Sequence, residues 1–412
     1  MVSITRDFAP PFKLIAPFFI IGAIFYVISN FLLFLVDIEQ LSSISDLYIV
    51  SWVHIFLLGF VMMTIFGAMA QLIPVVLERG HFSVDMYYVI WPLFTLGVLM
   101  MGYGFIHSHL VLSFGGMIVL IAMAVFSIET FLTIKDVEKF GLVVISVLIS
   151  NMFLLTGIVV GFIMALTFAG FISTDVMLLL KAHVYMLIGG YVFITIMAFS
   201  YILIPMFGLA HGFSTKPLKL AITLQSIASI LVFISALVDS EFVSRVGYLC
   251  SLISVLSYFY LIFTINKTRA RKENDMYIIS LLASFIFFAF GVVFGALHVG
   301  TSNEMYAVLS GWLIFVGFFG FMISGHLYKI VPFLVWYERF SPLVGKQKVP
   351  MLGDMVPTKS ANFQIFLTCT GIVLESFAIF FQNSDIHMAA ASFLIIGALF
   401  LFKNLMFMIR FK

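Results

Sequence analysis

Three long apolar runs share one pattern, and this repetition constrains the fold more than any other feature of the sequence. The runs cover residues 51–76, 183–207 and 312–334. Each closes with a small residue followed seven positions later by proline, at Gly67 and Pro74, Ala198 and Pro205, and Gly325 and Pro332. In the first and third runs, Gly59 also aligns with Gly317 without a gap. A spacing of about 130 residues predicts three similar units, at about 1–140, 141–270 and 271–412.

The composition places these runs in a membrane. Of the 412 residues, 63% are hydrophobic and only 10% are charged, which is more apolar surface than a soluble core needs. A helix crosses the bilayer with about 20 apolar residues. Twelve segments qualify, at about 14–36, 47–77, 86–108, 112–134, 142–170, 176–207, 217–238, 243–266, 276–300, 305–336, 360–382 and 386–410. We therefore expect an all-α, polytopic membrane protein in the lipid bilayer, a single integral membrane domain of twelve transmembrane helices. The first segment lacks a small-residue cleavage site, so we expect it to remain as a span.

Basic residues gather in alternate loops and indicate the orientation. They are Arg6 and Lys13, Arg79, Lys135 and Lys139, Lys216 and Lys219, Lys267 to Lys272, Arg339 to Lys359, and Lys403 to Lys412. On the other side only Lys181 and Arg245 interrupt loops that carry acidic residues. By the positive-inside rule, we expect both termini in the cytoplasm and the protein in a bacterial cytoplasmic (inner) membrane. The basic run at 267–272 fits this topology signal, so no nucleic-acid partner is expected.

Three histidines on separate spans share one predicted depth. His54 and His183 open the second and sixth spans and His298 closes the ninth, so all three fall in the outer third of the membrane. Ionisable groups inside spans are costly and usually face the bundle interior. Neutral imidazole is a good ligand for haem iron or copper, which predicts a haem or metal site. The alternative is three histidines that hydrogen-bond neighbouring helices. His107 and His109, at the outer end of span three, can extend a metal site or lie at the interface.

Other ionisable residues suggest a path for protons or quinone. His326 and Lys329 lie in the cytoplasmic half of span ten, where they form such a path or snorkel to the interface. Glu375, about the middle of span eleven, is either a proton-relay acid or a buried carboxyl kept neutral by hydrogen bonding. The sequence leaves both interpretations open. The remaining histidines fall in loops and are expected to be solvated: His81, His211 and His387.

Twelve spans in three units, with histidines opening spans two and six, resemble subunit I of the haem–copper oxidases. The resemblance implies that His54 binds a haem, b-type here, and that His183 binds an active-site copper. It also implies a redox partner such as cytochrome c or a quinol. The chain departs from the family pattern, because residues 216–238 lack a His-His pair and Leu309–Phe319 contains Trp312 but no histidine. The chain therefore looks like the degenerate relatives of that fold, including the NnrS-type proteins, and His298 is a candidate to pair with His54 or His183.

Three functions follow from these observations. The leading one is a haem-binding membrane protein in respiratory electron transfer or nitric-oxide handling that lacks a complete dioxygen-reducing centre. The second is a transporter for a metal or small solute, since internal repeats and polar residues inside spans suit that class as well. The third is an active oxidase or reductase subunit with non-standard ligands. Whether the protein is an enzyme is left open.

Overall fold

The computed structural model describes residues 10–135, 137–138 and 140–412, so Arg6 and Lys139 of the basic pattern lie outside it. The described residues form helices and no β-strand. Twelve helical stretches among them are long and apolar enough to cross a membrane, which confirms the all-α, twelve-span prediction. Nine of these spans are single helices: α1 (Phe12–Leu33), α5 (Asp85–His107), α6 (His109–Lys135), α7 (Leu142–Phe168), α10 (Lys216–Val238), α11 (Glu241–Thr268), α12 (Met276–Thr301), α15 (Thr358–Phe381) and α16 (Ser384–Ile409).

The other three spans are the repeated apolar runs, and each combines an α-helix, a π-helix and a second α-helix. They are α3 (Leu47–His54), η1 (Ile55–Met62) and α4 (Met63–Leu77); α8 (Val176–Val184), η2 (Tyr185–Phe193) and α9 (Ile194–Gly208); and α13 (Glu304–Trp312), η3 (Leu313–Phe319) and α14 (Gly320–Arg339). These spans contain 31, 33 and 36 residues, which is well beyond the minimum for crossing a bilayer. Each π-helix occupies the same place in the repeat. Short α2 (Ile38–Leu41) and the 3₁₀ turn η4 (Ser341–Leu343) lie in loops.

A polar side chain begins each long span. Asp46 accepts hydrogen bonds from the backbone N–H groups of Tyr48 and Ile49, Asp175 accepts from Leu178, and Asn303 accepts from Met305. These caps satisfy donors that the first helical turn leaves without partners. The repeat is therefore visible at the start of each long span as well as in its π-helix.

A glycine inside each π-helix lies against a phenylalanine of the preceding span. A Cβ added at Gly59 would lie 2.4 Å from Phe25 Cγ, one at Gly190 would lie 2.6 Å from Phe153 Cγ, and one at Gly317 would lie 2.6 Å from Phe287 Cβ. Only the absence of a side chain permits this approach. Helices α1, α7 and α12 therefore pack in the same manner against η1, η2 and η3.

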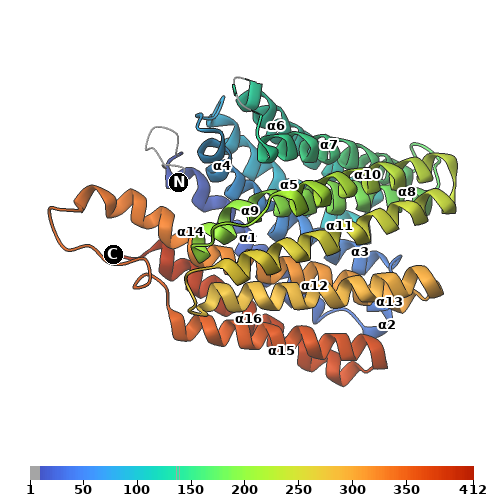
Figure 1. Cartoon of the computed structure of the whole chain (residues 1–412). Coiled ribbons are helices and arrows are strands. Elements are labelled where there is room, and N and C mark those ends of the chain that lie inside the picture. Colours follow the sequence, from blue (N-terminus) through green and yellow to red (C-terminus); the bar gives the residue numbers. More distant parts are fainter. Residues whose placement is uncertain (1–9, 136, 139) are drawn as a thin grey trace. The chain divides into compact units, whose positions relative to one another are not determined.

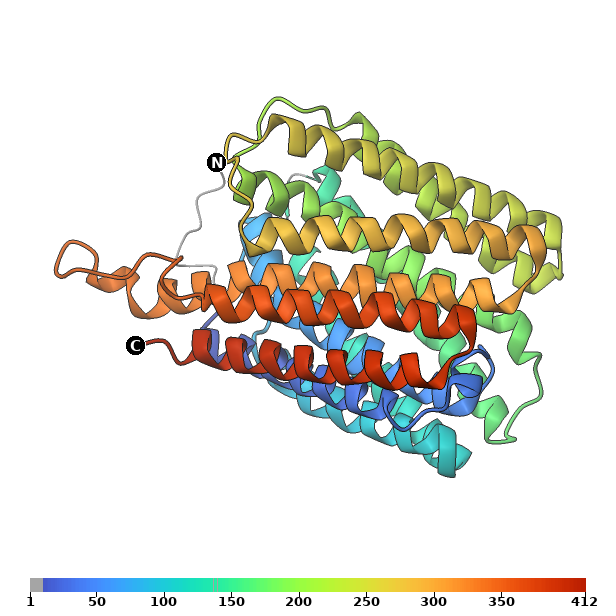
Figure 2. The same ribbon diagram turned by 90° about the horizontal axis from the view of Figure 1, so that it is seen from below.

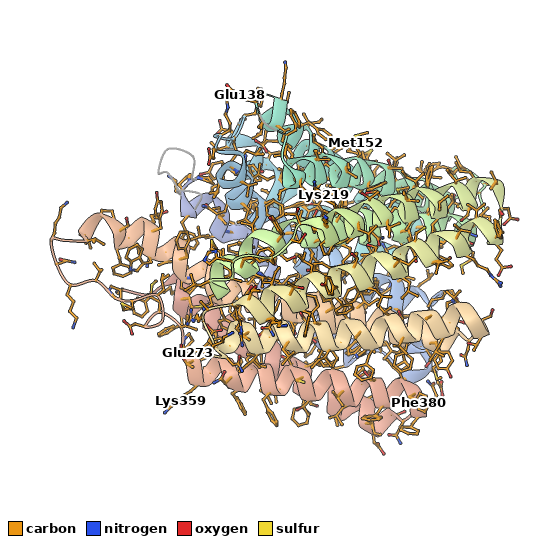
Figure 3. The ribbon with its side chains drawn as sticks, viewed as in Figure 1. Glu138, Met152, Lys219, Glu273, Lys359 and Phe380 are labelled. Carbon is orange, nitrogen blue, oxygen red and sulfur yellow. The ribbon has the colours of Figure 1, made fainter. Side chains whose placement is uncertain are left out.

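The chain divides into two compact units. Within the described residues, one unit holds 73–97 and 109–273, and the other holds 10–72, 98–108 and 274–412. Helices α15 and α16, both labelled in Figure 1, run side by side in the second unit as the two red helices of Figure 2, and Lys359 and Phe380 mark the two ends of α15 in Figure 3. The local repeat is present in the three long spans, while the arrangement of three four-helix units stays a prediction.

Candidate functional site

His54 and His183 both stand at the entrance to a π-helix. His54 is the last residue of α3, and its Nδ1 lies 2.7 Å from the backbone oxygen of Val50. Its ring packs on Phe105 with 4.8 Å between ring centroids. His183 is the penultimate residue of α8, two positions before the repeat equivalent of His54. The two rings therefore occupy similar but not identical places in their spans.

The His183 ring lies on the backbone of α7. Its Nδ1 is 3.0 Å from the backbone oxygen of Gly157. A Cβ at Gly161, one turn later, would lie 2.5 Å from His183 Cε1. Gly161 therefore makes room for the imidazole, whereas a Cβ at Gly157 would meet Leu187 and Met186 instead.

The hydrogen bonds define which ring nitrogen carries the proton. A backbone carbonyl oxygen only accepts, so Nδ1 of His54 and of His183 must be the donor. In a neutral ring Nε2 is then the basic nitrogen, and this is the tautomer that metal-bound histidines commonly hold through a hydrogen bond from their other nitrogen. Both residues therefore have the donor chemistry that haem iron requires.

His298 is held in a local turn. Its Nδ1 lies 2.9 Å from the backbone oxygen of Asn303, just after the end of α12, and the side chain is half-buried. The ring thus closes the link between α12 and α13, as a structural histidine would. Pairing of His298 with His54 or His183 remains a prediction.

Two of the predicted copper ligands, His107 and His109, have rings that pack on aromatic side chains. The described residues contain no group of three or more His, Cys, Asp or Glu side chains that could hold a metal ion. His107 is exposed, and its ring packs on Tyr103 at 4.7 Å, while the ring of His109 packs on Phe168 at 5.4 Å. A copper site at His183, His107 and His109 gains no support from this arrangement.

Two tryptophans are buried against each other, and one of them, Trp312, lies in the segment of span ten where the haem–copper oxidase pattern would place histidines. Trp52 and Trp312 stack with 5.9 Å between ring centroids, and their exposed fractions are 5% and 4%. Trp52 Nε1 donates to the backbone oxygen of Ser29, and Trp312 Nε1 donates to that of Ile372. The position of Trp312 is therefore used for packing and helix-to-helix hydrogen bonding.

Glu375 is paired with a histidine that sequence reasoning placed in solvent. His387 lies in the first turn of α16, not in a loop, and its Nδ1 is 2.8 Å from Glu375 Oε1. Its Nε2 is 2.9 Å from the backbone oxygen of Val36, and both side chains are almost completely buried. The expectation of a solvated His387 is wrong. Glu375 lies six residues before the end of α15, or about 9 Å along the axis, which is about halfway between the middle of the span and its end. The short link between α15 and α16 is the signal that could have paired the two residues, because antiparallel neighbours meet across it.

A second buried carboxyl–imidazole pair joins the loop after α4 to α6. His81 Nδ1 lies 2.9 Å from Glu129 Oε1, and the side chains are 1% and 0% exposed, so His81 is in a loop as expected but is not solvated. Thr133 also donates to Oε1, and the Tyr87 hydroxyl donates to Oε2. Both oxygens of Glu129 therefore have partners. His211, by contrast, is exposed in its loop as expected.

His326 and Lys329 both meet the start of α12. Lys329 Nζ lies 2.6 Å from Asp275 Oδ2, and each side chain is 21% exposed. His326 Nδ1 lies 2.7 Å from the backbone oxygen of Met322, and Nε2 lies 3.4 Å from the Tyr277 hydroxyl. The two predicted residues thus belong to one polar group near the end of the span.

A buried row of polar side chains links α14, α15 and α16 and was not foreseen. Ser360 donates to Asn404 Oδ1, and Asn404 Nδ2 donates to the Tyr328 hydroxyl. Tyr328 donates to Gln364 Oε1, and Gln364 Nε2 donates to Thr368 Oγ1. The regular spacing of Ser360, Gln364 and Thr368 on one face of α15 was the available signal.

Comparison with known proteins adds no family to this geometry. No family model matches the chain, and no curated protein matches it either.

Proposed function

We propose that this protein is a haem-binding integral membrane protein, related in architecture to subunit I of the haem–copper oxidases, that holds a b-type haem through Nε2 of His54 or His183. One observation supports the proposal above the others. On two corresponding spans, an imidazole at the entrance to a π-helix donates its Nδ1 hydrogen to a backbone carbonyl, so Nε2 is the basic nitrogen of the neutral ring, as in many metal-bound histidines. π-Helical turns often accompany functional sites.

The protein residues prepare the imidazoles, and the haem supplies the redox chemistry. When bound, haem would provide an iron centre for one-electron transfer or for binding nitric oxide. Val50 and Gly157 set the tautomers, and Phe105 and Gly161 set the ring planes of His54 and His183. Copper is not part of the proposal, since the described residues offer no group of three ligands.

The setting proposed for this activity is a bacterial cytoplasmic membrane with both termini in the cytoplasm. The alternation of basic and acidic loops supports this orientation. A haem in the outer third of the bilayer would exchange electrons with cytochrome c or a quinol, so a respiratory or nitric-oxide-related role is proposed.

The test is a reduced-minus-oxidised absorption spectrum of the purified protein, with metal analysis of the same sample. We expect b-type haem bands without stoichiometric copper. Either His54→Ala or His183→Ala should remove most of the haem absorbance, and His211→Ala, in an exposed loop, is the matched control. A colourless protein, or full haem content in both variants, would refute the proposal. Haem together with copper would instead favour an active oxidase or reductase.

A proton-coupled transporter of a metal or small solute is the second candidate. The two buried carboxyl–imidazole pairs, Glu129 with His81 and Glu375 with His387, favour it because such pairs inside spans commonly serve proton relays. A metal-free, colourless protein that takes up solute in proteoliposomes only under a pH gradient would select this candidate over haem binding.

A further inference from the structure

Glu375 and His387 hold a single proton between them. His387 Nε2 faces the backbone oxygen of Val36, which only accepts, so Nε2 carries a hydrogen. Nδ1 and Glu375 Oε1 are 2.8 Å apart, a distance that requires one hydrogen between them. That hydrogen belongs either to a carboxylic acid beside a neutral ring or to an imidazolium beside a carboxylate. The net charge of the pair is zero in both forms.

The second oxygen of Glu375 is buried without a hydrogen-bond partner among the described residues. A buried polar atom without a partner is rare and costly, and such an atom often marks a site for water or for proton exchange. The carboxyl of Glu129 is the internal comparison, because both of its oxygens are bound by named donors. One oxygen of Glu375 can therefore accept a further proton, whereas both oxygens of Glu129 already accept hydrogen bonds.

The geometry favours gain of a proton over loss of one. In the doubly protonated ring, Nδ1–H points at Glu375 Oε1 and Nε2–H points at Val36 O, so both donors have acceptors. Loss of the shared proton would leave the Nδ1 lone pair facing a carboxylate oxygen at 2.8 Å. The pair therefore accommodates the states with charge zero and plus one.

No other buried ionisable group is seen to contact the pair among the described residues. The acidic groups on the elements around it are all exposed: Asp37, Glu39, Glu304 and Asp385. They lie on or beside elements that pack on α15, and their negative charges attract protons to the end of α15 next to the α15–α16 link.

The row of polar side chains along α15 does not provide a path for protons from Glu375 to the opposite end of the helix. Its links pass through the side-chain amides of Asn404 and Gln364, which donate and accept hydrogen bonds but do not titrate. The row therefore offers no continuous chain of titratable groups toward the opposite end of α15.

We propose that the Glu375–His387 pair is a proton-binding site that exchanges through Glu375 Oε2 with the compartment at the end of the helices where the α15–α16 link lies, the outer side by the loop charges. In the uptake step a hydronium ion donates its proton to Oε2 of the carboxylate beside the imidazolium. One O–H bond forms on Glu375, one breaks in hydronium, and water leaves. The pair passes from zero to plus one, and release reverses the step. This site does not depend on haem binding.

Infrared difference spectroscopy of the full chain in lipid nanodiscs tests the proposal. Acidification from about pH 8 to about pH 5 should produce a carboxylic-acid C=O band that shifts in D₂O. Glu375→Gln should abolish the band while keeping a hydrogen-bonding amide beside His387. Glu129→Gln, which alters the Glu129–His81 pair, should leave the band in place.

The wild-type spectrum alone can overturn the inference. Absence of any acid-induced C=O band in the folded protein would mean that the pair is only a structural hydrogen bond. Persistence of the band in Glu375→Gln would assign it to another carboxyl and refute the site. If Glu375→Gln does not fold, Glu375→Asp retains a carboxyl with a shorter reach, and its band should move in frequency; an unmoved band refutes the assignment equally.

Discussion

Replacing Gly317 by alanine should destabilise the protein by about 1–3 kcal/mol. The new Cβ would lie 2.6 Å from Phe287 Cβ, 2.8 Å from its Cγ and 3.2 Å from its Cδ2. Carbon atoms pack best at about 3.5–4.0 Å, so α12 and η3 would have to separate by roughly 1 Å. Phe287 Cβ is attached directly to the α12 backbone, and a rotamer change therefore cannot relieve the contact. Alanine gains up to about 1 kcal/mol in helix propensity, which offsets only part of the cost.

Gly320→Ala is the matched control in the same span. Gly320 is three residues later and also buried, but a Cβ there meets nothing within 4 Å. We expect this variant to be neutral or slightly more stable, because only the helix-propensity gain applies.

The assay is thermal unfolding in one detergent. The quantity measured at each temperature is the fraction of protein that remains monodisperse after heating. Gly317→Ala should lower the midpoint by a few degrees, while Gly320→Ala should leave it unchanged or raise it. Equal midpoints for the two variants would refute the close approach of α12 to η3. Gly59→Ala and Gly190→Ala should behave like Gly317→Ala, since each meets a phenylalanine at a similar distance.

Three further changes test individual contacts by the same unfolding assay. Trp312→Phe keeps an aromatic ring but removes the N–H that donates to Ile372 O, so a loss of about 1 kcal/mol is expected; an unchanged midpoint would show that the bond is dispensable. Lys329→Met and Asp275→Asn, alone and combined, should give a coupling energy of about 0.5–1 kcal/mol, and strict additivity would argue against their pairing at 2.6 Å. Glu129→Gln should cost about 1–3 kcal/mol, because the amide nitrogen that replaces one oxygen cannot accept a hydrogen bond; wild-type stability would contradict this account of the cluster.

The twelve spans could be predicted because crossing a bilayer is a local property of length and hydrophobicity. The π-helices could not be predicted, although the sequence contains two features that accompany them: the length of the three spans and their aligned glycines. The three repeated spans exceed the length of a simple crossing. Each of them places a glycine against phenylalanine in a π-helical segment, and that arrangement depends on the neighbouring helix. The aligned Gly59 and Gly317 indicated the place but not the hydrogen-bond pattern.

The buried histidines were misjudged because proximity to a loop was equated with exposure. His81 and His387 lie at or beside the ends of spans, where water is close, yet each is covered by its neighbours and bound to a carboxyl. A lone ionisable group at such a place would stay in water, but a hydrogen-bonded pair with zero net charge is far less costly to bury. Pairing across a helical hairpin is tertiary information that residue type alone does not carry.

The repeat preserves backbone packing while its side chains diverge at the level where chemistry is expected. The position of His54 is occupied by Tyr185 in the second long span and by Trp312 in the third. The glycine–phenylalanine contact recurs in all three spans because it determines how closely helices approach, whereas the entrance to the π-helix carries no such restriction. In the third long span this position holds Trp312, which is buried against Trp52 and donates its indole N–H to the backbone oxygen of Ile372. The three long spans are therefore equivalent in backbone packing but not in the side chain at this position, and the repeat does not encode three identical ligands.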